Sequence, residues 1–407
     1  MTMALSGIRV IDMTSILMGP YATQLLGDFG ADIIKIEPLN GDNTRWIGPA
    51  RHPGMSGGFL GTNASKRSVA INLKTEAGKQ ILLRMATHAD VLIYNVRPQA
   101  MARLGLTYEV LSALNSRLLY VGVFGYGRGG RYAAKPAYDD LIQALTGLPW
   151  LYGQATGSEP RYVPAPIVDR VVGVYAAMTI LAGLQARDRI GVGQQIDVPM
   201  FETFAQMIMG SHLQGHAFVP PIGPIGYSRM LSPSRKPYRT SDGYVAILPY
   251  TDENWRRLFE VAGQLERYEA DPRFRDITLR TQNIDALYEI LEEIVAERTT
   301  AEWLALLEKA DVPSMPVHSL ESLLHDPHLA DVGFFKIHEH PTEQRLRGMS
   351  APSKWSVTQP GPTRPAPALG EHTCSVMDEM GYTPHEIETL VKQGVLGSPA
   401  SPVRKAV

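Results

Sequence analysis

The sequence predicts an α/β protein with a parallel, Rossmann-like sheet and a second, smaller domain. Short apolar segments alternate with helix-like segments through about the first 200 residues, and parallel strands need such helical crossovers between them. In addition, 407 residues are many for one hydrophobic core, so more than one domain is expected.

The first strand–helix–strand unit lies at the N-terminus. IRVIDM (8–13) is strand-like, GPYATQLLGDFG (19–30) has the composition of a helix closed by glycine, and ADIIKIE (31–37) is a second strand. A unit this compact predicts two parallel strands joined by a right-handed crossover. The alternation continues with strands expected at 67–73, 89–95, 117–126 and 194–200, and helices at 75–88, 107–115, 138–147, 169–187 and from about 201.

The composition changes at residues 218–237, which are rich in Pro, Gly and Ser and are typical of an extended linker. YRTSDGYVAI then predicts a β-hairpin, and amphipathic helices follow near 252–263, 283–297 and 300–309. Beyond residue 350 the chain is again Pro-rich before a last helical segment, TPHEIETLVKQG. The predicted organisation is a large domain over 1–217, the linker 218–237, a small α+β domain over 238–340, and a return to the large domain over 341–407.

The overall composition excludes several functional classes. The 39 basic and 41 acidic residues nearly balance, so a general nucleic-acid binder is not expected. Cys374 is the single cysteine, which leaves no disulfide framework and fits a reducing cytoplasm. The N-terminus lacks a signal-peptide pattern, and the uncharged run 171–186 is short for a membrane span. We therefore expect a cytoplasmic protein that binds no membrane.

Two motifs could carry other chemistry, and a third is absent. GYGRGG (125–130) follows a strand but lacks the G-x-G-x-x-G spacing, so a plain turn is favoured over a dinucleotide site. His212 and His216 are spaced i, i+4 on an expected helix without a nearby carboxylate, which favours structural roles over a metal site. There is no G-x-S-x-G nucleophile motif.

Basic residues follow two of the expected strands. Lys74 comes after one strand, and Arg97 and Arg103 come after another. Ligands of parallel α/β sheets bind outside the carboxyl ends of the strands, where such cations suit phosphate groups. A solvated surface is an equally good interpretation of these residue types alone.

Asp169 and Arg170 stand directly before the uncharged run 171–186. Asp is a preferred N-cap residue and stabilises the positive end of a helix dipole, so the local pattern favours capping. A reactive carboxylate is the second interpretation. The two are compatible, because the field at a helix N-terminus keeps a nucleophilic carboxylate ionised.

Segments spread over nearly the whole chain resemble the family III CoA-transferases, the group of formyl-CoA and carnitine CoA-transferases and the related α-methylacyl-CoA racemases. They include LSGIRVIDMT, GPYATQLLGDFGADIIKIEP, NASKRSVAINLKTEAGK, ADVLIYNVRPQAMARLGLTYEVL, PAYDDLIQALTGL, GVGQQIDVPMFE and ALGEHTCSVMDEMGY. The resemblance implies a large Rossmann-like domain built from both ends of the chain. It also implies a ring-shaped chain that interlocks with a second copy as a homodimer.

The resemblance further implies the site residues and the reaction. Asp169 matches the catalytic aspartate, which takes up the acyl group as an anhydride and then CoA as a thioester. CoA and acyl-CoA are then substrates, and neither a metal nor a tightly bound cofactor is expected. Pro38 stands where relatives often carry an arginine that contacts CoA. The residues that match CoA-contacting positions are Leu17, Met18, Asn72, Leu73, Lys74, Asn95, Val96, Arg97, Arg103 and Asp139.

Two alternatives to a CoA-transferase share this scaffold. A racemase needs two bases at the α-carbon, supplied in those relatives with the help of a His-Asp pair. Here Tyr138 precedes Asp139, and a phenol that titrates near pH 10 is a poor base. A catalytically silent acyl-CoA-binding protein is disfavoured by the intact Asp169.

The substrate acids are less strongly indicated by the sequence. Leu17 stands where oxalate-using relatives carry Gln, which argues against a formyl/oxalate pair. A basic group in and after the linker could hold the second carboxylate of a dicarboxylic acid such as succinate, although a solvated loop is the favoured interpretation of these residues. The group consists of Arg229, Arg235, Lys236 and Arg239.

Overall fold

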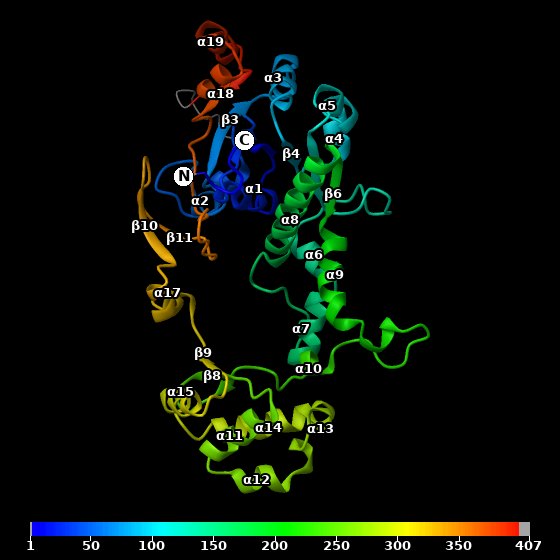
Figure 1. Ribbon diagram of the computed structural model, residues 1–407, viewed down its shortest axis with the longest axis vertical. Coiled ribbons are helices and arrows are strands. Elements are labelled where there is room, and N and C mark those ends of the chain that lie inside the picture. Colours follow the sequence, from blue (N-terminus) through cyan, green and yellow to red (C-terminus); the bar gives the residue numbers. More distant parts are fainter. Residues whose placement is uncertain (1, 399–407) are drawn as a thin grey trace. The chain divides into compact units, whose positions relative to one another are not determined.

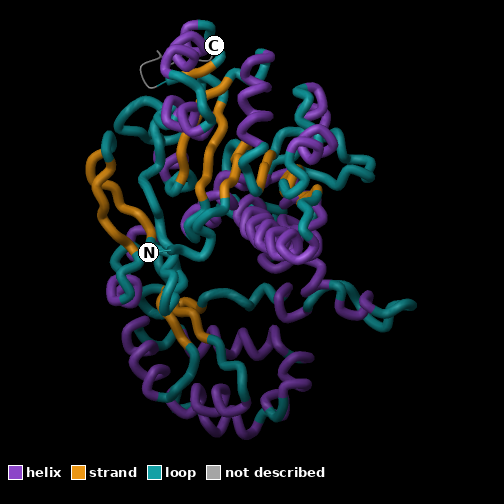
Figure 2. Tube along the Cα trace, turned by 45° about the horizontal axis from the view of Figure 1, so that its top comes forward, coloured by secondary structure: helices purple, strands orange, loops and turns teal. Residues whose placement is uncertain are grey.

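The computed structural model describes residues 2–398, and its largest element is a seven-stranded sheet (Figures 1 and 2). The strand order is β12-β3-β2-β1-β4-β5-β6. Strands β1 to β6 are parallel, and β12 pairs antiparallel with β3. The α/β class with a large parallel sheet is therefore confirmed. The strands are β1 (Arg9–Met13), β2 (Asp32–Glu37), β3 (Lys66–Ile71), β4 (Val91–Tyr94), β5 (Leu119–Phe124), β6 (Gln195–Pro199) and β12 (Leu396–Gly397).

The central strands are apolar on both faces, as expected when helices cover both sides of a parallel sheet. Successive side chains of a strand point to opposite faces. Ile11 of β1 belongs to one cluster of buried residues, whereas its neighbour Val10 is equally buried but lies outside that cluster. The register pairs Val10 with Ile33 and Val91, so each face continues across adjacent strands.

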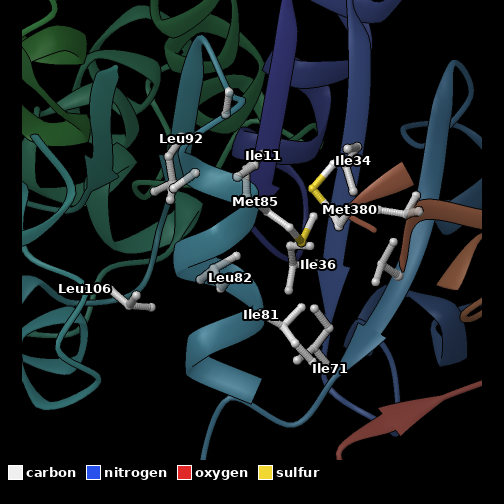
Figure 3. Close-up of a cluster of buried hydrophobic side chains, with 14 of the residues drawn as sticks. Ile11, Ile34, Ile36, Ile71, Ile81, Leu82, Met85, Leu92, Leu106 and Met380 are labelled. Carbon is white, nitrogen blue, oxygen red and sulfur yellow. The ribbon is translucent and has the colours of Figure 1, made fainter. Parts of the chain in front are cut away.

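One face is covered by α3 (Glu76–Ala86) and by the C-terminal part of the chain. Figure 3 shows Ile81, Leu82 and Met85 of α3 beside the strand residues, together with Met380, which directly follows α18 (Thr373–Glu379). Helix α19 (Pro384–Lys392) then leads to β12 at the sheet edge. Both ends of the chain thus contribute to one hydrophobic core.

The other face carries α1 (Met18–Asp28) and α8 (Ile167–Ile190), which pack against each other. Gly173 permits the close approach, because a Cβ there would lie 2.8 Å from the carbonyl oxygen of Met18. Within the described residues, α8 alone is long and apolar enough to cross a membrane, a test that core helices also pass. Its contacts with α1, β5 and β6 identify it as a helix packed on the sheet.

Shorter elements complete this first unit, which holds the residues up to Thr146, Pro164–Gln206 and those from His328 onward. A hairpin of β10 (Phe335–His340) and β11 (Gln344–Met349) was not predicted from the sequence. The remaining elements are η1 (Asn43–Trp46), α2 (Gly57–Leu60), α4 (Pro98–Arg103), α5 (Tyr108–Leu114), α6 (Asp139–Leu145) and α9 (Met200–His212), whose last turns extend beyond the unit.

The second unit comprises Gly147–Val163 and Met207–Pro327. Its small sheet contains the predicted hairpin, β7 (Tyr238–Arg239) and β8 (Tyr244–Ile247), with β9 (Ser314–Pro316) beside β8. Its helices surround a core rich in aromatic residues that includes Trp255, Phe259 and Trp303. They are α7 (Leu148–Thr156), α10 (Ser228–Leu231), α11 (Asp252–Val261), α12 (Leu265–Ala270), α13 (Ile277–Gln282), α14 (Ile284–Val295), α15 (Thr300–Lys309) and α16 (Leu320–Leu323), with η2 (Gln214–Ala217) and η3 (Pro272–Phe274); α17 (Pro327–Asp331) spans the boundary.

Candidate active site

A cavity of about 250 Å³ lies at the carboxyl ends of the central strands. The chain leaves β1 toward β2 on one side, whereas β4 lies on the other side of β1. Connections that diverge in this way leave a crevice, which is where doubly wound α/β proteins bind ligands. The lining residues come from the segments after β1 and β4, from the end of β5 and the segment after it, and from the starts of α1, α8 and α9: Ser15, Ile16, Leu17, Met18, Asn95, Val96, Arg97, Val123, Phe124, Gly125, Lys135, Pro136, Ala137, Tyr138, Asp169 and Met200.

Asp169 lies in the first turn of α8 and lines this cavity. The prediction that it caps the helix is wrong: Pro166 occupies the N-cap position, and Asp169 is the third residue of the helix. The cap comes from elsewhere in the chain. The carboxylate of Asp139, the first residue of α6, accepts a hydrogen bond from the backbone N–H of Asp169 at 2.9 Å. The Asp169 side chain is therefore not needed for capping.

The Asp139 carboxylate is held in place by Gln143, which lies one turn further along α6. Gln143 Nε2 donates to Asp139 Oδ1 at 2.6 Å, and the Gln143 side chain is fully buried. The other oxygen of Asp139, Oδ2, accepts from Asp169. The Asp139 carboxylate is thus fixed beside Asp169 at the N-terminus of α8.

The environment of Asp169 raises the pKa of its carboxyl group from 3.8 to about 7. Burial is the largest cause, because it disfavours the charged form, and the negative charge of Asp139 adds to it. Arg170 lowers the pKa by a smaller amount, and its guanidinium stacks on Tyr21 of α1, with its central carbon Cζ 4.3 Å from the ring centre. Burial and the Asp139 charge oppose the expectation that the helix terminus keeps Asp169 ionised, because they favour the protonated form.

Comparison with known proteins assigns the chain to a family. The model of the family described as CoA-transferase family III matches residues 5–373. The chain belongs to CoA-transferase family III. Nearly the whole chain is covered, so the predicted membership and the predicted class of enzyme are both confirmed.

Several relatives in CoA-transferase family III are similar over most of their length. An acyl-CoA transferase of Fusarium pseudograminearum is 32% identical, over 97% of this chain and 88% of its own. The mouse (Mus musculus) succinyl-CoA:glutarate CoA-transferase is 30% identical, over 96% and 90%. An acetyl-CoA:oxalate CoA-transferase of Acetobacter aceti is 36% identical over a shorter stretch, 76% of this chain and 80% of its own.

Two solved structures have a similar fold. A CAIB/BAIF family protein from Brucella suis is 29% identical and superposes with a TM-score of 0.79, covering 93% of this chain and all of that one. Rv3272 from Mycobacterium tuberculosis is 30% identical with a TM-score of 0.80, covering 92% of this chain and 99% of that one. The fold of the chain is thus shared with known family III structures.

Six of the residues predicted to act on or bind CoA meet at the cavity. Leu17 and Met18 lie between β1 and the first turn of α1, and Met18 is buried. Asn95, Val96 and Arg97 follow β4. Arg97 is the exposed N-cap residue of α4. These six residues are Leu17, Met18, Asn95, Val96, Arg97 and Asp169.

The other predicted CoA contacts do not line the cavity. The segment 72–74 follows β3, three strands from β4 along the same edge of the sheet. Asn72 is engaged locally, because its amide accepts from the backbone N–H of Lys74 and donates to the carbonyl of Gly394. Arg103 is the exposed last residue of α4. Asp139 acts on the backbone of Asp169 instead.

Lys135 also belongs to the cavity wall, although it was not predicted from the sequence. Lys135 and Tyr138 belong to the segment between β5 and α6. Tyr138 is 66% exposed, and the Lys135 Nζ lies 4.3 Å from the ring centre of Tyr132. Their position after the carboxyl end of a central strand was the signal that could have identified them.

The motif GYGRGG forms a turn after β5, at the border of a neighbouring cavity of about 320 Å³. Arg128 of this turn is ion-paired with Asp197 at 2.6 Å and donates to the Tyr94 hydroxyl. The cavity shares Phe124 with the one beside Asp169 and has five aromatic residues in its wall, namely Tyr94, Tyr108, Tyr120, Phe124 and Tyr126. Arg128 therefore already has an acidic partner within the protein.

The two histidines considered as a metal pair do not share a helix. Helix α9 ends at His212, and His216 lies in η2, so the expected i, i+4 helical geometry is wrong. His212 Nδ1 accepts a hydrogen bond from the backbone of Tyr227, which is a structural role. Among residues 2–398, no three His, Cys, Asp or Glu side chains are grouped so that they could hold a metal ion.

A group of buried charges lies behind the loop that joins β1 to α1. Lys66 Nζ pairs with Asp12 at 3.2 Å, and Lys35 Nζ pairs with Asp42 at 2.9 Å. The four side chains are at most 1% exposed. Burial alone would raise the pKa of Asp12, but Lys66 and Lys35 bring it below its ordinary value. The carboxylates in this group are therefore held ionised by their lysine partners.

Proposed function

We propose that this family III CoA-transferase uses Asp169 as its nucleophile and accepts a small dicarboxylate, such as succinate, as donor or acceptor acid. The observation that carries the proposal is the position of Asp169 in a cavity at the carboxyl ends of β1, β4 and β5. Within residues 2–398, no hydrogen bond to its carboxylate oxygens is present, although Asp139 fixes its backbone. A carboxylate placed in this way is free to react.

The first half of the proposed reaction transfers CoA to the protein. A carboxylate oxygen of Asp169 attacks the thioester carbonyl carbon, the C–S bond breaks, and the CoA thiolate leaves behind a mixed anhydride. The thiolate then attacks the carbonyl carbon of Asp169, which releases the donor acid as a carboxylate and leaves an aspartyl-CoA thioester. Each step exchanges one acyl bond for another and consumes no water.

The second half reverses these steps with the acceptor acid. The acceptor carboxylate attacks the aspartyl thioester and expels the CoA thiolate, which gives a new mixed anhydride. The thiolate attacks the acceptor carbonyl, so the new acyl-CoA forms and the Asp169 carboxylate is regenerated. Exclusion of water from the partly buried site protects both intermediates from hydrolysis.

The long CoA molecule requires contacts beyond the cavity, and three of the predicted cations suit its phosphates. Arg97 borders the cavity, and Arg103 lies at the other end of the same helix, α4. Lys74 lies after β3 on the same edge of the sheet. We assign these three residues to CoA binding.

The dicarboxylate proposal is supported by the relatives and by a cation of the cavity. Relatives act on succinate with glutarate or with mesaconate, as their names state. Lys135 borders the cavity that contains Asp169 and would hold the carboxylate of the acid that does not react. The basic group proposed from sequence is a weaker candidate, because Lys236 pairs with Glu292 and Arg229 donates to the Tyr288 hydroxyl.

We also propose a cytoplasmic homodimer. Val174, Tyr175 and Met178 are exposed on α8, close to the proposed nucleophile in sequence. An apolar surface of this kind is favourable to cover, and a second copy of the chain is the partner expected from the family resemblance. Light scattering of the purified protein should give twice the mass of the chain.

The decisive experiment is an exchange assay with isotope-labelled succinate and a panel of acyl-CoA donors. We expect label to appear in succinyl-CoA, and treatment with hydroxylamine during turnover should modify Asp169. Turnover confined to long monocarboxylic acids would refute the dicarboxylate proposal. Deuterium uptake at the α-carbon without an acceptor acid would indicate a racemase instead, and CoA binding without any exchange would indicate a silent binding protein.

A further inference from the structure

The loop between β1 and α1, residues 14–17, contains a backbone conformation that is rare for its residue type. Ile16 has a φ of +71°, in the left-handed region that β-branched residues seldom enter. The neighbours Ser15 and Leu17 line the cavity beside Asp169, as does Ile16 itself. Such a conformation persists where surrounding groups hold it, and it occurs most often at functional sites.

Asn95 holds this loop from the end of β4. Its Oδ1 accepts from the backbone N–H of Ser15 at 3.0 Å, and its Nδ2 donates to the carbonyl of the same residue at 2.8 Å. The amide side chain therefore pairs with both backbone groups of one loop residue. Both of its polar atoms face the loop, which leaves this side chain poorly suited to bind CoA.

Asp42 holds the next residue of the loop from the opposite side. Its two carboxylate oxygens accept from the backbone N–H of Ile16 at 3.2 and 3.3 Å. Lys35 donates to Asp42 at 2.9 Å and to the carbonyl of Thr14 at 2.9 Å. Lys35 and Asp42 are buried, so any shift of Asp42 would leave the lysine charge without its partner in the interior.

We infer that Asn95 is a positioning residue for acyl transfer at Asp169, and not a CoA contact through its side chain. Together with Asp42 it fixes the loop so that Leu17 and Met18 form the cavity wall facing the nucleophile. The inference rests on the proposed role of Asp169. Reacting groups must be held within a fraction of an ångström, so a loosened wall should slow the chemical step more than it weakens binding.

The test compares Asn95→Ala with wild type in the first half-reaction, measured as the rate at which Asp169 becomes labelled by hydroxylamine at saturating acyl-CoA. We expect this rate to fall by about ten- to a hundredfold. The Kd for CoA, measured by calorimetry, should stay within about twofold of wild type. Asn95→Asp keeps the oxygen that accepts from the backbone N–H of Ser15 but places a second oxygen against the Ser15 carbonyl. This variant should therefore also lower the labelling rate and leave the Kd for CoA nearly unchanged.

Asn115→Ala is the matched control. The Asn115 side chain also binds two backbone groups, the carbonyls of Ala86 and Ala89 at 3.0 and 2.8 Å, but before β4 and β5 at the opposite edge of the sheet. This variant should lower the thermal stability and leave the labelling rate of Asp169 unchanged.

Two results would overturn the inference. A weaker Kd for CoA with an unchanged saturating rate in either Asn95 variant would make Asn95 a CoA contact, and unchanged values of both would remove it from the site. Wild-type labelling is measured first, so a wild-type protein that is never labelled at Asp169 would refute the proposed function, separately from the role of Asn95.

Discussion

Two groups of buried carboxylates in the same unit have opposite properties. Asp12 is completely buried, pairs with Lys66 and accepts a hydrogen bond from the Thr23 hydroxyl, and its pKa lies below the ordinary value. Asp169 is less buried, lies next to the acidic Asp139, and has a pKa of about 7. Burial acts in the same direction on both, so the neighbouring charges make the difference.

This difference separates a structural carboxylate from a reactive one. The oxygens of Asp12 are occupied by a lysine and by hydrogen-bond donors, so a reaction there would first have to break a buried ion pair. The Asp169 carboxylate has a like charge beside it and borders a cavity. A carboxylate with a raised pKa is a stronger nucleophile once it is ionised, and it reaches that state near neutral pH.

The largest effect is expected on the CoA exchange rate when Asp169 is replaced. Asp169→Asn should lower the CoA exchange rate by more than about a thousandfold, because the amide cannot form the anhydride. The assay is exchange of label between succinate and succinyl-CoA under saturating conditions. An exchange rate within tenfold of wild type would show that another residue carries the acyl group.

The same substitution should stabilise the fold. The pKa of Asp169 is raised on folding from 3.8 to about 7, so the folded protein holds this proton more tightly and loses stability as the pH rises through that interval. Asp169→Asn removes the titration, which should add on the order of 4 kcal/mol to the free energy of unfolding at pH 8 and nothing below pH 3.8. Urea titrations at several pH values measure this difference.

On the structural side, Asp12→Asn should destabilise the fold by about 3 to 5 kcal/mol at neutral pH, because it leaves Lys66 buried without its partner. The stability that Asp12 contributes is present above its ordinary pKa of 3.8 and is lost at lower pH. Glu388→Gln is the control, since Glu388 pairs with Lys392 at the exposed surface, and it should leave the free energy of unfolding nearly unchanged. If both variants lost the same free energy of unfolding in urea titrations, the distinction between the buried and the exposed ion pair would be contradicted.

A moderate effect is expected on the pH dependence of the reaction. Below about pH 7 the wild-type kcat/KM should fall tenfold per pH unit, as Asp169 becomes protonated. Asp139→Asn removes the negative charge beside Asp169, while the cations Arg170, Arg97 and Lys135 remain nearby. The pKa of Asp169 should therefore fall, and this limb of the pH profile should move to lower pH. Asp140→Asn, on the exposed side of the same helical turn, should leave the limb in place.

The smallest effect is expected in the strained loop. Ile16→Gly relieves a left-handed conformation but gives up a half-buried side chain, so the free energy of unfolding should change by less than about 1 kcal/mol. Exchange activity should be retained, because the backbone N–H of residue 16 still meets Asp42. A loss of several kcal/mol in urea unfolding would show that the side chain, and not the backbone, secures the loop.

Much of the fold could be predicted because its signals are local. The strands of the parallel sheet are continuous apolar segments, and the helices between them carry amphipathic patterns, so β1 to β6 were expected within a few residues of their observed positions. The strand β12 has two residues and the β10–β11 hairpin exposes most of its side chains. Neither has the hydrophobic periodicity that identifies a strand.

The candidate site was less predictable because it depends on distant partners. The local pattern assigned the cap of α8 to Asp169, whereas the hydrogen bond comes from Asp139, 30 residues earlier. The local pattern also could not show the second carboxylate that raises the pKa of Asp169. The same holds for Asn95, whose partner Ser15 lies 80 residues away. Only the spread of matching segments over the chain pointed to the chemistry.

The antiparallel strand β12 has a consequence for how the protein is made. During synthesis β3 emerges early, but its outer neighbour β12 and the α18 and α19 side chains that cover the same core are translated about 300 residues later. Until β12 has emerged from the ribosome, β3 is an unprotected edge beside an open apolar surface, a state in which chains associate wrongly. A chain shortened before Val376 should therefore precipitate when expressed, however well the site itself is encoded.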